Sequence, residues 1–310
     1  MPEGDTLRRL ADMLAARFVG QEVVGNLFRH PRYSTSDFTG ATLTSVDSRG
    51  KHLLMRFSNG YTVHVHLRMT GAVYPRFPRE IRAHRRKFEI EMTDGWIVAV
   101  DIPILGIMRT KDERHAVGHL GPDICGHYDH DLAIQQLSSA GDVPISQAML
   151  DQRVVAGFGN IYAVETPFIT GINPNTFVSS LSNVEALLSI GVGLIRTNAR
   201  RGPQNTTGRN IHLTNHWVLS SEIRRCKVCG SDLVKRSGRE TAWTRRTSWC
   251  EQCQPLTNTE VDLTRAAKLL AGHPCRKIVD LKTGKLLVPV NEPVVAAALR
   301  TNEGGMKRSR

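Results

Sequence analysis

Apolar residues recur at helical spacing near the start of the chain. Between Asp5 and Phe18 they occupy positions 7, 10, 11, 14, 15 and 18. Steps of three and four residues place these side chains on one face of a helix. The pattern predicts an amphipathic helix that begins near Gly4 or Asp5. The positive end of its dipole would favour ionised carboxylates at Glu3 and Asp5.

From residue 22 to about residue 108, apolar and polar residues instead alternate with a period of two, which is typical of β-strands. Residues 53–67 predict a hairpin around Asn59-Gly60, and its second strand alternates valine and leucine with threonine and histidine. Residues 88–100 predict another hairpin, with Asp94-Gly95 at its turn. We expect a β-sandwich or barrel-like domain with the first helix packed at its edge.

Helical spacing returns beyond a predicted linker at residues 118–126, which contains Gly121-Pro122. The predicted helical segments are residues 131–137, 145–150 and 184–197. Between the last two, Gly157 and Gly159 frame a short loop that leads into a helix. Such a loop can present backbone N–H groups to an anion. An ordinary helix hairpin would look the same, so both interpretations stay open.

Residues 255–310 form a tail in which the sequence shows no chemistry. The pattern predicts a helix over residues 262–271, a hairpin over residues 278–290 around Thr283-Gly284, and a short helix over residues 294–299.

Charge is unevenly balanced in this chain. There are 41 Lys+Arg against 29 Asp+Glu, a formal net charge of +12 at pH 7. This excess favours a polyanionic partner, most simply nucleic acid, because neutralising phosphates releases counterions. A basic protein with no such partner remains the alternative. No apolar run reaches the ~20 residues needed to span a bilayer, and charged residues interrupt the first segment, so we expect a cytosolic protein.

Four of the six cysteines form two C-x-x-C pairs, which are Cys226, Cys229, Cys250 and Cys253. In a cytosolic chain this spacing indicates a metal site rather than disulfides. Four thiolates are the ligand set of a closed structural zinc site, which leaves no open position for catalysis. We therefore predict one structural Zn²⁺ per chain, held in a segment so small that the metal supplies most of its folding energy.

The chain opens Met1-Pro2-Glu3-Gly4-Asp5. If Met1 is removed, Pro2 carries a free secondary amine, and an α-amine has a reference pKa of roughly 7.7–8.0. A useful fraction would be unprotonated at neutral pH and could attack an aldehyde carbon to form an iminium. Glu3 stands beside it as a candidate acid. By itself, the opening favours an ordinary start residue, and only the rest of the chain changes this interpretation.

Five motifs in consistent order give the chain a resemblance to the formamidopyrimidine-DNA glycosylase and endonuclease VIII family of base-excision repair enzymes. They cover roughly residues 2–254 and comprise Pro2-Glu3-Gly4, Arg49-Gly50-Lys51-His52-Leu53-Leu54, His66-Leu67-Arg68-Met69-Thr70-Gly71, Asp151-Gln152 with Glu165, and the zinc-finger end Trp249-Cys250-Glu251-Gln252-Cys253-Gln254.

The resemblance implies a multidomain α+β fold. It would contain an N-terminal β-sandwich with a leading helix over residues 1–117, a helix–two-turn–helix DNA-binding domain over residues 126–217, and a zinc-finger hairpin over residues 218–254. Residues 255–310 would be a C-terminal extension of unknown role. The implied partner is double-stranded DNA that contains oxidised bases or abasic sites. We expect a monomer with no membrane association, located at the nucleoid when it acts on DNA.

The resemblance also implies roles for individual residues. Pro2 would attack C1′ of the damaged nucleotide, Glu3 would act as acid and base on the deoxyribose, and Lys51 would lie near the base and phosphates. The alternative for Lys51 is a solvated turn lysine.

The other implied contacts are with DNA. Asn160 would bind the phosphate flanking the lesion, and Glu165 belongs to the same matched motif. Arg245 would be the phosphate-binding arginine of the zinc finger, although Arg246 is adjacent. Met69 would fill the gap left by the extruded base, unless it is a core methionine.

The sequence departs from the family in two places. Asp5-Thr6 stands where well-known members have Pro-Glu. Asp101-Ile102-Pro103-Ile104-Leu105-Gly106 lacks the Arg-Phe wedge of the formamidopyrimidine branch. The second departure favours the endonuclease VIII branch, which prefers oxidised pyrimidines, and makes Ile104 or Leu105 a candidate for filling the gap.

Three classes of function follow. The first is a bifunctional DNA glycosylase and abasic-site lyase that forms a Schiff base at Pro2 and nicks the strand by β- or β,δ-elimination. The second is a non-catalytic binder of damaged DNA, against which the intact Pro2 and Glu3 argue. The third is a zinc-ribbon protein of the translation or transcription machinery, which would need no free proline amine.

Overall fold

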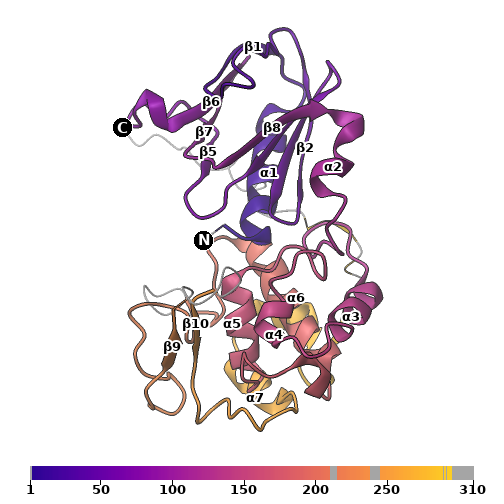
Figure 1. Cartoon of the computed structure of the whole chain (residues 1–310), viewed down its shortest axis with the longest axis vertical. Helices are drawn as coiled ribbons and strands as arrows, with labels where there is room; N and C mark the ends of the chain where they lie inside the picture. Colours follow the sequence, from indigo (N-terminus) through magenta and orange to yellow (C-terminus); the bar gives the residue numbers. More distant parts are fainter. Residues whose placement is uncertain (1, 210–214, 238–244, 289, 291, 295–310) are drawn as a thin grey trace, which may run out of the picture. The chain divides into compact units, whose positions relative to one another are not determined.

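The computed structural model describes residues 2–209, 215–237, 245–288, 290 and 292–294. The described chain divides into two compact units, with the boundary between His119 and Leu120. The first unit is built mainly from strands and the second mainly from helices (Figure 1). The predicted helix over residues 294–299 lies almost wholly outside the described residues.

Two antiparallel sheets of four strands make up the first unit. One has the order β1-β6-β7-β5 and the other β2-β3-β4-β8. Their apolar faces pack together in one core. The strands are β1 (Val23–Phe28), β2 (Leu43–Arg49), β3 (His52–Phe57), β4 (Tyr61–His66), β5 (Ala72–Tyr74), β6 (Arg86–Met92), β7 (Gly95–Val100) and β8 (Ile104–Arg109). The expected β-sandwich is confirmed.

Both predicted hairpins are present. β3 pairs with β4 around residues 58–60, and β6 pairs with β7 around residues 93–94. Gly60 has φ 79° and Gly95 has φ 116°, which are left-handed conformations that favour glycine. The glycines of the two sequence signals therefore occupy the positions that reverse the chain.

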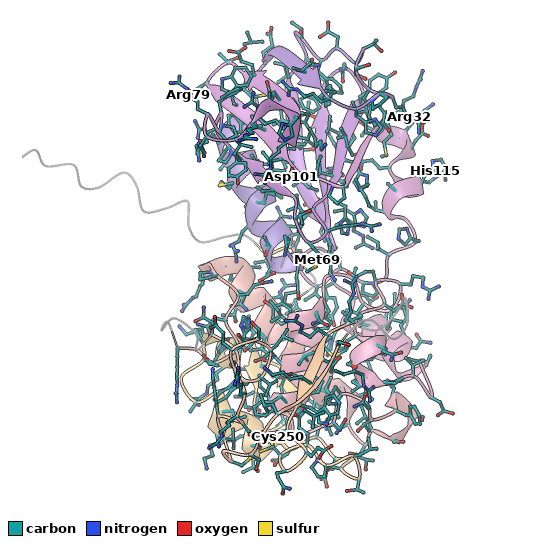
Figure 2. All side chains as sticks on the ribbon, turned by 60° about the vertical axis from the view of Figure 1, so that its left-hand side comes forward. Arg32, Met69, Arg79, Asp101, His115 and Cys250 are labelled. Atoms are coloured by element: carbon teal, nitrogen blue, oxygen red, sulfur yellow. The ribbon has the colours of Figure 1, made fainter. Side chains whose placement is uncertain are left out.

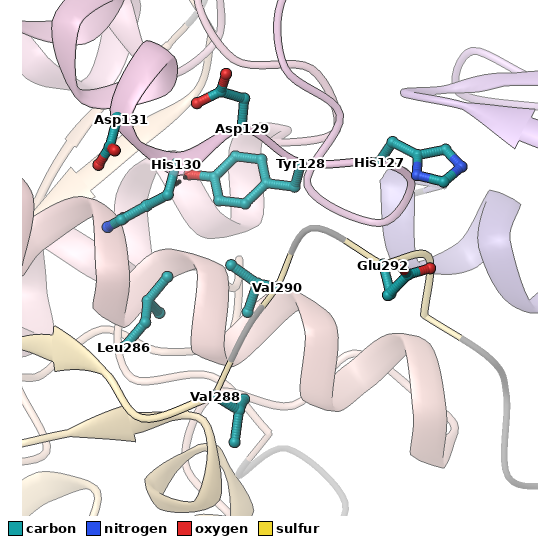
Figure 3. Close-up of a pocket in the computed structure, with 9 residues that line it drawn as sticks. All are labelled: His127, Tyr128, Asp129, His130, Asp131, Leu286, Val288, Val290 and Glu292. Carbon is teal, nitrogen blue, oxygen red and sulfur yellow. Dashed lines mark hydrogen bonds between the residues drawn. The ribbon is translucent and has the colours of Figure 1, made fainter.

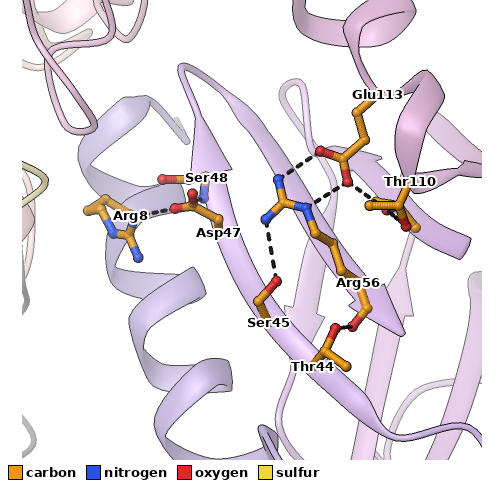
Figure 4. Close-up of polar contacts among 9 residues, drawn as sticks. Arg8, Thr44, Ser45, Asp47, Ser48, Arg56, Thr110 and Glu113 are labelled. Atoms are coloured by element: carbon orange, nitrogen blue, oxygen red, sulfur yellow. Dashed lines mark hydrogen bonds and ion pairs between the residues drawn. The ribbon is translucent and has the colours of Figure 1, made fainter. Parts of the chain in front are cut away.

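The leading helix α1 spans Gly4–Phe18, as the spacing predicts. Its apolar stripe, Leu7, Ala11, Leu14 and Phe18, is buried in the sandwich core. Arg8 adds a polar lock, because its guanidinium binds Asp12 on the same helix and Asp47 on β2, the latter at 2.5 Å (Figure 4). This contact fixes the rotation of α1 against the sheet.

Figure 4 also shows a second ion pair in the same sheet, near Ser45 on β2. Arg56 on β3 makes two bonds of 2.7 Å with the carboxylate of Glu113. Glu113 also accepts a hydrogen bond from Thr62 on β4 at 2.6 Å. It lies between the short helices η2 (Thr110–Asp112) and α2 (Arg114–Val117), so the pair ties this segment to two strands.

The second unit has a helical core. Its helices are α3 (His130–Ser138), α4 (Ile145–Ala148), α5 (Asn160–Ile169) and α6 (Val184–Arg201), with the single turn η3 (Val178–Ser180). The predicted helical segments at residues 131–137, 145–150 and 184–197 match α3, α4 and α6. Helix α6 is buried along most of its length, and Asn183 caps it by accepting a hydrogen bond from the Ala186 N–H. A small hairpin of β9 (Val234–Arg236) and β10 (Thr247–Trp249) follows.

The tail is part of this second core. It contains α7 (Leu263–Leu269), η4 (Pro274–Lys277), and the paired strands β11 (Val279–Asp280) and β12 (Lys285–Leu286). The predicted helix and hairpin are therefore present. The tail side chains buried in the core are Val261, Ala266, Leu270, Cys275, Ile278, Val279, Leu281, Val290 and Val294.

Tight packing joins the tail to α6. A Cβ added at Gly193 would lie 2.6 Å from Val279, and one added at Gly284 would lie 2.4 Å from Ala186. Arg196, which is 3% exposed, donates hydrogen bonds to the carbonyl of Val290. Arg196 also donates to the carbonyls of Glu292 and Ile124. Removing the tail would thus expose core surface and take two of the three carbonyl acceptors from a buried guanidinium.

Candidate functional site

The first element of the candidate site is the start of α1. Glu3 is the N-cap residue, and its backbone carbonyl accepts hydrogen bonds from the N–H groups of Thr6 and Leu7 at 3.0 and 3.1 Å. The Glu3 side chain is fully buried, and Pro2 is half-buried. Because the stripe of α1 and the Arg8 lock fix this helix, they also fix where Pro2 and Glu3 lie.

Lys51 occupies a two-residue turn between β2 and β3. Arg49 pairs with His52 across the turn, and Gly50 supplies a left-handed φ of 56°. The Lys51 side chain is half-buried. Burial lowers the pKa of both His52 and His66, and the positive charge of Lys51 lowers it further. Lys51 thus lies in a turn but is not fully solvated, and its charge acts on a histidine cluster.

The histidine cluster of His52, His64 and His66 was not anticipated from the sequence. His52 Nδ1 and His64 Nε2 are 2.7 Å apart, and the two rings stack at 5.0 Å. His66 meets the His52 ring edge-on at 4.8 Å. Burial, then the neighbouring positive groups, lowers the pKa of His52 to about 3 and that of His66 to about 4. The cluster is thus neutral at neutral pH.

Met69, labelled in Figure 2, lies between β4 and β5. The residue is 59% exposed. This exposure excludes the interpretation of Met69 as a core methionine. Ile104 and Leu105 are the other candidates for filling the gap left by the extruded base. They lie at the start of β8 and are only partly buried.

Asn160 and the zinc-finger arginines lie together in the second unit. Asn160 is the first residue of α5, after the N-cap Gly159, and its Nδ2 donates a hydrogen bond to the Arg246 carbonyl at 2.8 Å. Both Arg245 and Arg246 are exposed. The amide group of Asn160 retains a second N–H. The structure therefore brings the backbone of Arg246 to the start of a helix and to the amide of Asn160, and the start of a helix suits an anion.

Gln152 shapes the loop before α5. Its Oε1 accepts a hydrogen bond from the Gly157 N–H at 3.0 Å, and its Nε2 donates to the Phe158 carbonyl at 2.9 Å. Gly157 has φ 115°, a conformation that L side chains rarely adopt. The matched Asp151-Gln152 motif thus contributes the support of the loop that presents Asn160.

Glu165 is not on the surface, where a residue that contacts DNA would have to lie. It is fully buried on α5, and its carboxylate accepts four hydrogen bonds from the protein. The donors are the N–H groups of Trp217, Val218 and Leu219 and the hydroxyl of Thr206. We therefore interpret Glu165 as a residue that positions the segment 215–219.

The four cysteines of the two C-x-x-C pairs converge beside the β9–β10 hairpin. Their sulfur atoms all lie within 4.8 Å of one another. Cys226 Sγ is 3.8 Å from Cys253 Sγ, and Cys229 Sγ is 3.4 Å from Cys250 Sγ. Four sulfurs at about 2.3 Å from a tetrahedral zinc ion would be separated by about 3.8 Å. The donor set and its spacing therefore fit the predicted metal.

A separate hollow of about 710 Å³ occurs on the second unit (Figure 3). Its walls are the start of α3 and the strand region of the tail, and none of the predicted site residues lines it. Inside the hollow, His130 Nδ1 is 3.2 Å from the Tyr128 hydroxyl, and burial lowers the pKa of His130. Among the described residues, no helix is long and apolar enough to cross a membrane.

Comparisons with known proteins agree with this architecture. The family model of the formamidopyrimidine-DNA glycosylase N-terminal domain matches residues 1–103, and the model of its H2TH domain matches residues 120–193. The chain belongs to this family. Its fold is the one that the resemblance implied.

The relatives include endonuclease 8 proteins. Probable endonuclease 8 2 of Streptomyces coelicolor is 36% identical over 261 residues, which cover 82% of this chain and 94% of that protein. The DNA-(apurinic or apyrimidinic site) lyase Nei2 of Mycolicibacterium smegmatis is 34% identical over 255 residues, which cover 82% and 99%. Since the relatives are matched nearly to their full length, part of this chain extends beyond them.

A solved structure shares the fold. The Lactococcus lactis formamidopyrimidine-DNA glycosylase in a complex with DNA containing N7-benzyl-Fapy-dG has a TM-score of 0.67 at 21% identity. The likeness covers 82% of this chain and 100% of that one.

Proposed function

We propose that this protein is a bifunctional DNA glycosylase and abasic-site lyase that removes oxidised bases, with oxidised pyrimidines as the preferred class. The observation that carries the proposal is the placement of Pro2 and Glu3 at the start of α1, a helix held by its apolar stripe and the Arg8 lock. The endonuclease 8 relatives and the missing Arg-Phe wedge in residues 101–106 support the pyrimidine preference.

The chemistry begins with the nitrogen of Pro2, once Met1 has been removed. The lesion nucleotide leaves the base stack, which exposes its C1′. The amine attacks C1′, a nitrogen–carbon bond forms, and the base leaves with the electrons of the glycosidic bond. Glu3 supplies and accepts protons at the deoxyribose as the sugar ring opens to the iminium. Loss of a C2′ proton then expels the 3′ phosphate by β-elimination, and a second elimination expels the 5′ phosphate.

DNA binding involves both units in this proposal. In the first unit, Lys51 faces the lesion and Met69 fills the gap that the extruded base leaves. In the second, Asn160 and Arg245 bind the phosphate next to the lesion through N–H donors and the α5 dipole. Glu165 contributes indirectly, through the segment that it positions. The net charge of +12 supplies the long-range attraction for DNA.

The four cysteines would hold one structural zinc ion. Bound to four protein thiolates, the metal would stabilise the β9–β10 hairpin and leave no open position for substrate. Its role is therefore to keep Arg245 and Arg246 near Asn160. This protein would act as a monomer in the cytoplasm, on the DNA of the nucleoid.

Borohydride trapping tests the proposal. The purified chain without Met1 is incubated with abasic-site duplex and sodium borohydride, which reduces an iminium to a stable amine. We expect a covalent protein–DNA adduct, and no adduct when one extra residue precedes Pro2, because the nitrogen is then an amide. Glu3→Gln should still be trapped on a preformed abasic site but should fail to release a base.

Lys51→Ala serves as the control for the identity of the trapped amine, because it removes the lysine that the proposal places at the lesion. The adduct should still form, since its amine is that of Pro2. Tight binding of abasic DNA without any adduct would contradict the proposal and indicate a non-catalytic binder. Stronger binding to structured RNA than to lesion duplex would contradict it in favour of an RNA-directed zinc-ribbon protein.

A further inference from the structure

Two connections in the first unit carry the chain from one sheet of the sandwich to the other. Residues 67–71 join β4 to β5, and residues 101–103 join β7 to β8. Strand pairing brackets both connections, because His66 pairs with Ile104 and Ala72 pairs with Val100. The two connections therefore run side by side in opposite directions and form one double corner of the sandwich.

The backbone is strained at this double corner. Arg68 has φ 47° and Asp101 has φ 48°, and in the described part of the chain no other non-glycine residue has a positive φ. Each of the two connections contains one of them. Residues in such conformations persist only where the surrounding structure determines them, and they gather at functional sites.

Direct contacts join the two connections. The Thr70 hydroxyl donates a hydrogen bond to the Asp101 carbonyl at 3.4 Å. A Cβ added at Gly71 would lie 2.7 Å from the Leu67 carbonyl oxygen and 3.2 Å from the Ile102 Cα, so only glycine fits there. The position of one connection therefore fixes the position of the other.

Arg85 holds Asp101 from outside the corner. Its Nε donates to Asp101 Oδ2 at 2.9 Å, its Nη2 binds the same oxygen, and its carbonyl accepts a hydrogen bond from the Asp101 N–H at 2.9 Å. The Arg85 guanidinium lowers the pKa of the Asp101 carboxyl. Since the two side chains are 53% and 28% exposed, their attraction contributes little to folding. The three hydrogen bonds with Arg85 nevertheless hold Asp101 in its left-handed backbone conformation.

The double corner presents Arg68 and Met69 to solvent. One exposed methionine is ordinary on a protein surface. Here, however, it follows a strained arginine directly, on a connection that is fixed at both ends by strand pairing. The Arg68 N–H also donates to His66 Nδ1 at 3.0 Å, which directs the backbone of this tip. A cation and an apolar side chain are thus held rigidly at one point.

We propose that Arg85 and Asp101 are positioning residues that hold Arg68 and Met69 as a rigid probe entering the duplex at the lesion. This inference rests on the proposed glycosylase function. Met69 occupies the space of the extruded base, and the Arg68 guanidinium donates to the acceptor atoms of the base left unpaired. Rigidity matters because a flexible tip would lose conformational entropy on each insertion.

The test compares two substrates of the same duplex sequence, one with thymine glycol and one with a preformed abasic site. The variants are Asp101→Asn, which tolerates a positive φ and removes the charge, and Arg85→Gln. Glu80→Gln is the matched control, because it breaks the exposed Arg76–Glu80 ion pair in the segment just before Arg85. The ratio of kcat/KM on thymine glycol to kcat/KM on the abasic site is measured for each.

We expect this ratio to fall roughly 10-fold in Asp101→Asn and Arg85→Gln, because small misplacements of a positioning group have effects of this order or larger. Glu80→Gln should keep the wild-type ratio. The proposal would be overturned if Asp101→Asn and Arg85→Gln both had the same kcat/KM ratio as Glu80→Gln. So would equal losses on the two substrates together with a lower unfolding temperature, because these would show a merely structural role.

Arg68→Gly separates function from folding more sharply. Glycine adopts φ 47° without strain, so this variant should unfold at a temperature no lower than the wild type, while its ratio falls roughly 10-fold like that of the positioning variants. A variant that is both as stable and as selective as the wild type would contradict the proposal. Adduct formation by the wild type on thymine glycol DNA, which requires release of the base, decides the glycosylase function separately from the ratio.

Discussion

Replacing Glu165 by Gln would keep the shape of a fully buried side chain and remove its charge. In the wild type, Oε1 accepts hydrogen bonds from the N–H groups of Val218 and Leu219 at 2.9 and 2.8 Å. Oε2 accepts from the Trp217 N–H at 2.6 Å and from the Thr206 hydroxyl at 2.5 Å. The glutamine amide can accept at only one of these two positions.

The structure indicates which position the amide nitrogen takes. In the place of Oε1, the amide nitrogen would face the N–H groups of Val218 and Leu219, and both would lose their acceptor. At Oε2 it could donate to the Thr206 hydroxyl, whose own proton would turn to the Asn215 carbonyl 3.1 Å away, and only the Trp217 N–H would lose its acceptor. One unpaired buried N–H costs about 1–3 kcal/mol, and the two bonds at Oε1 each lose about 1 kcal/mol with the charge. The expected loss of unfolding free energy is about 3–5 kcal/mol.

Urea unfolding, followed by circular dichroism, measures this loss for the second unit. Glu222→Gln is the control, because it makes the same substitution at an exposed position near the same segment. Hydrogen exchange should also show faster exchange at the amides of residues 217–219 in Glu165→Gln alone. A stability within about 0.5 kcal/mol of the control, with unchanged exchange, would refute the role assigned to Glu165.

Three other outcomes are expected. Arg8→Met should lower the unfolding free energy of the first unit by about 3–5 kcal/mol, since Asp12 loses its buried cation; urea unfolding measures this, and full recovery should not occur unless Asp12 is replaced as well. The unfolding free energy should fall as the pH drops from about 6.5 to 4, by at most about 1.4 kcal/mol per unit for each of His52 and His66, because both stay neutral when folded and bind protons when unfolded; His52→Gln should make this dependence shallower. Metal analysis should find about one zinc per chain, and Cys250→Ser should abolish both the metal and tight DNA binding; metal-free protein with wild-type DNA affinity would contradict the structural role.

Much of the fold follows from local patterns in the sequence. The 3–4 spacing predicts α1, and the glycines after Asn59 and Asp94 mark the turns of both hairpins, because period and turn chemistry are properties of neighbouring residues. The tail helix and hairpin follow for the same reason. That the tail belongs to the second core could not be foreseen, since the close approaches at Gly193 and Gly284 join residues far apart in the chain.

The candidate site divides in the same way. The cysteine spacing predicts the metal ligands, because two C-x-x-C pairs at this separation are typical of a structural zinc site. The burial of Glu165 and the stacking of His52 on His64 depend on tertiary packing, which no single motif records. The coupling of Arg68 with Asp101 through two adjacent connections has no sequence signal, because an arginine at a left-handed position is ordinarily disfavoured.

The most direct test of the account is to locate the carbon atom of the sugar on the protein after borohydride reduction. The adduct with abasic DNA is digested with nuclease and trypsin, and the modified peptide is sequenced by mass spectrometry. The account predicts that the reduced sugar is attached to the nitrogen of Pro2, in a peptide that begins at this residue. Attachment to the Nζ of Lys51, or full lyase activity in protein that retains Met1, would contradict it.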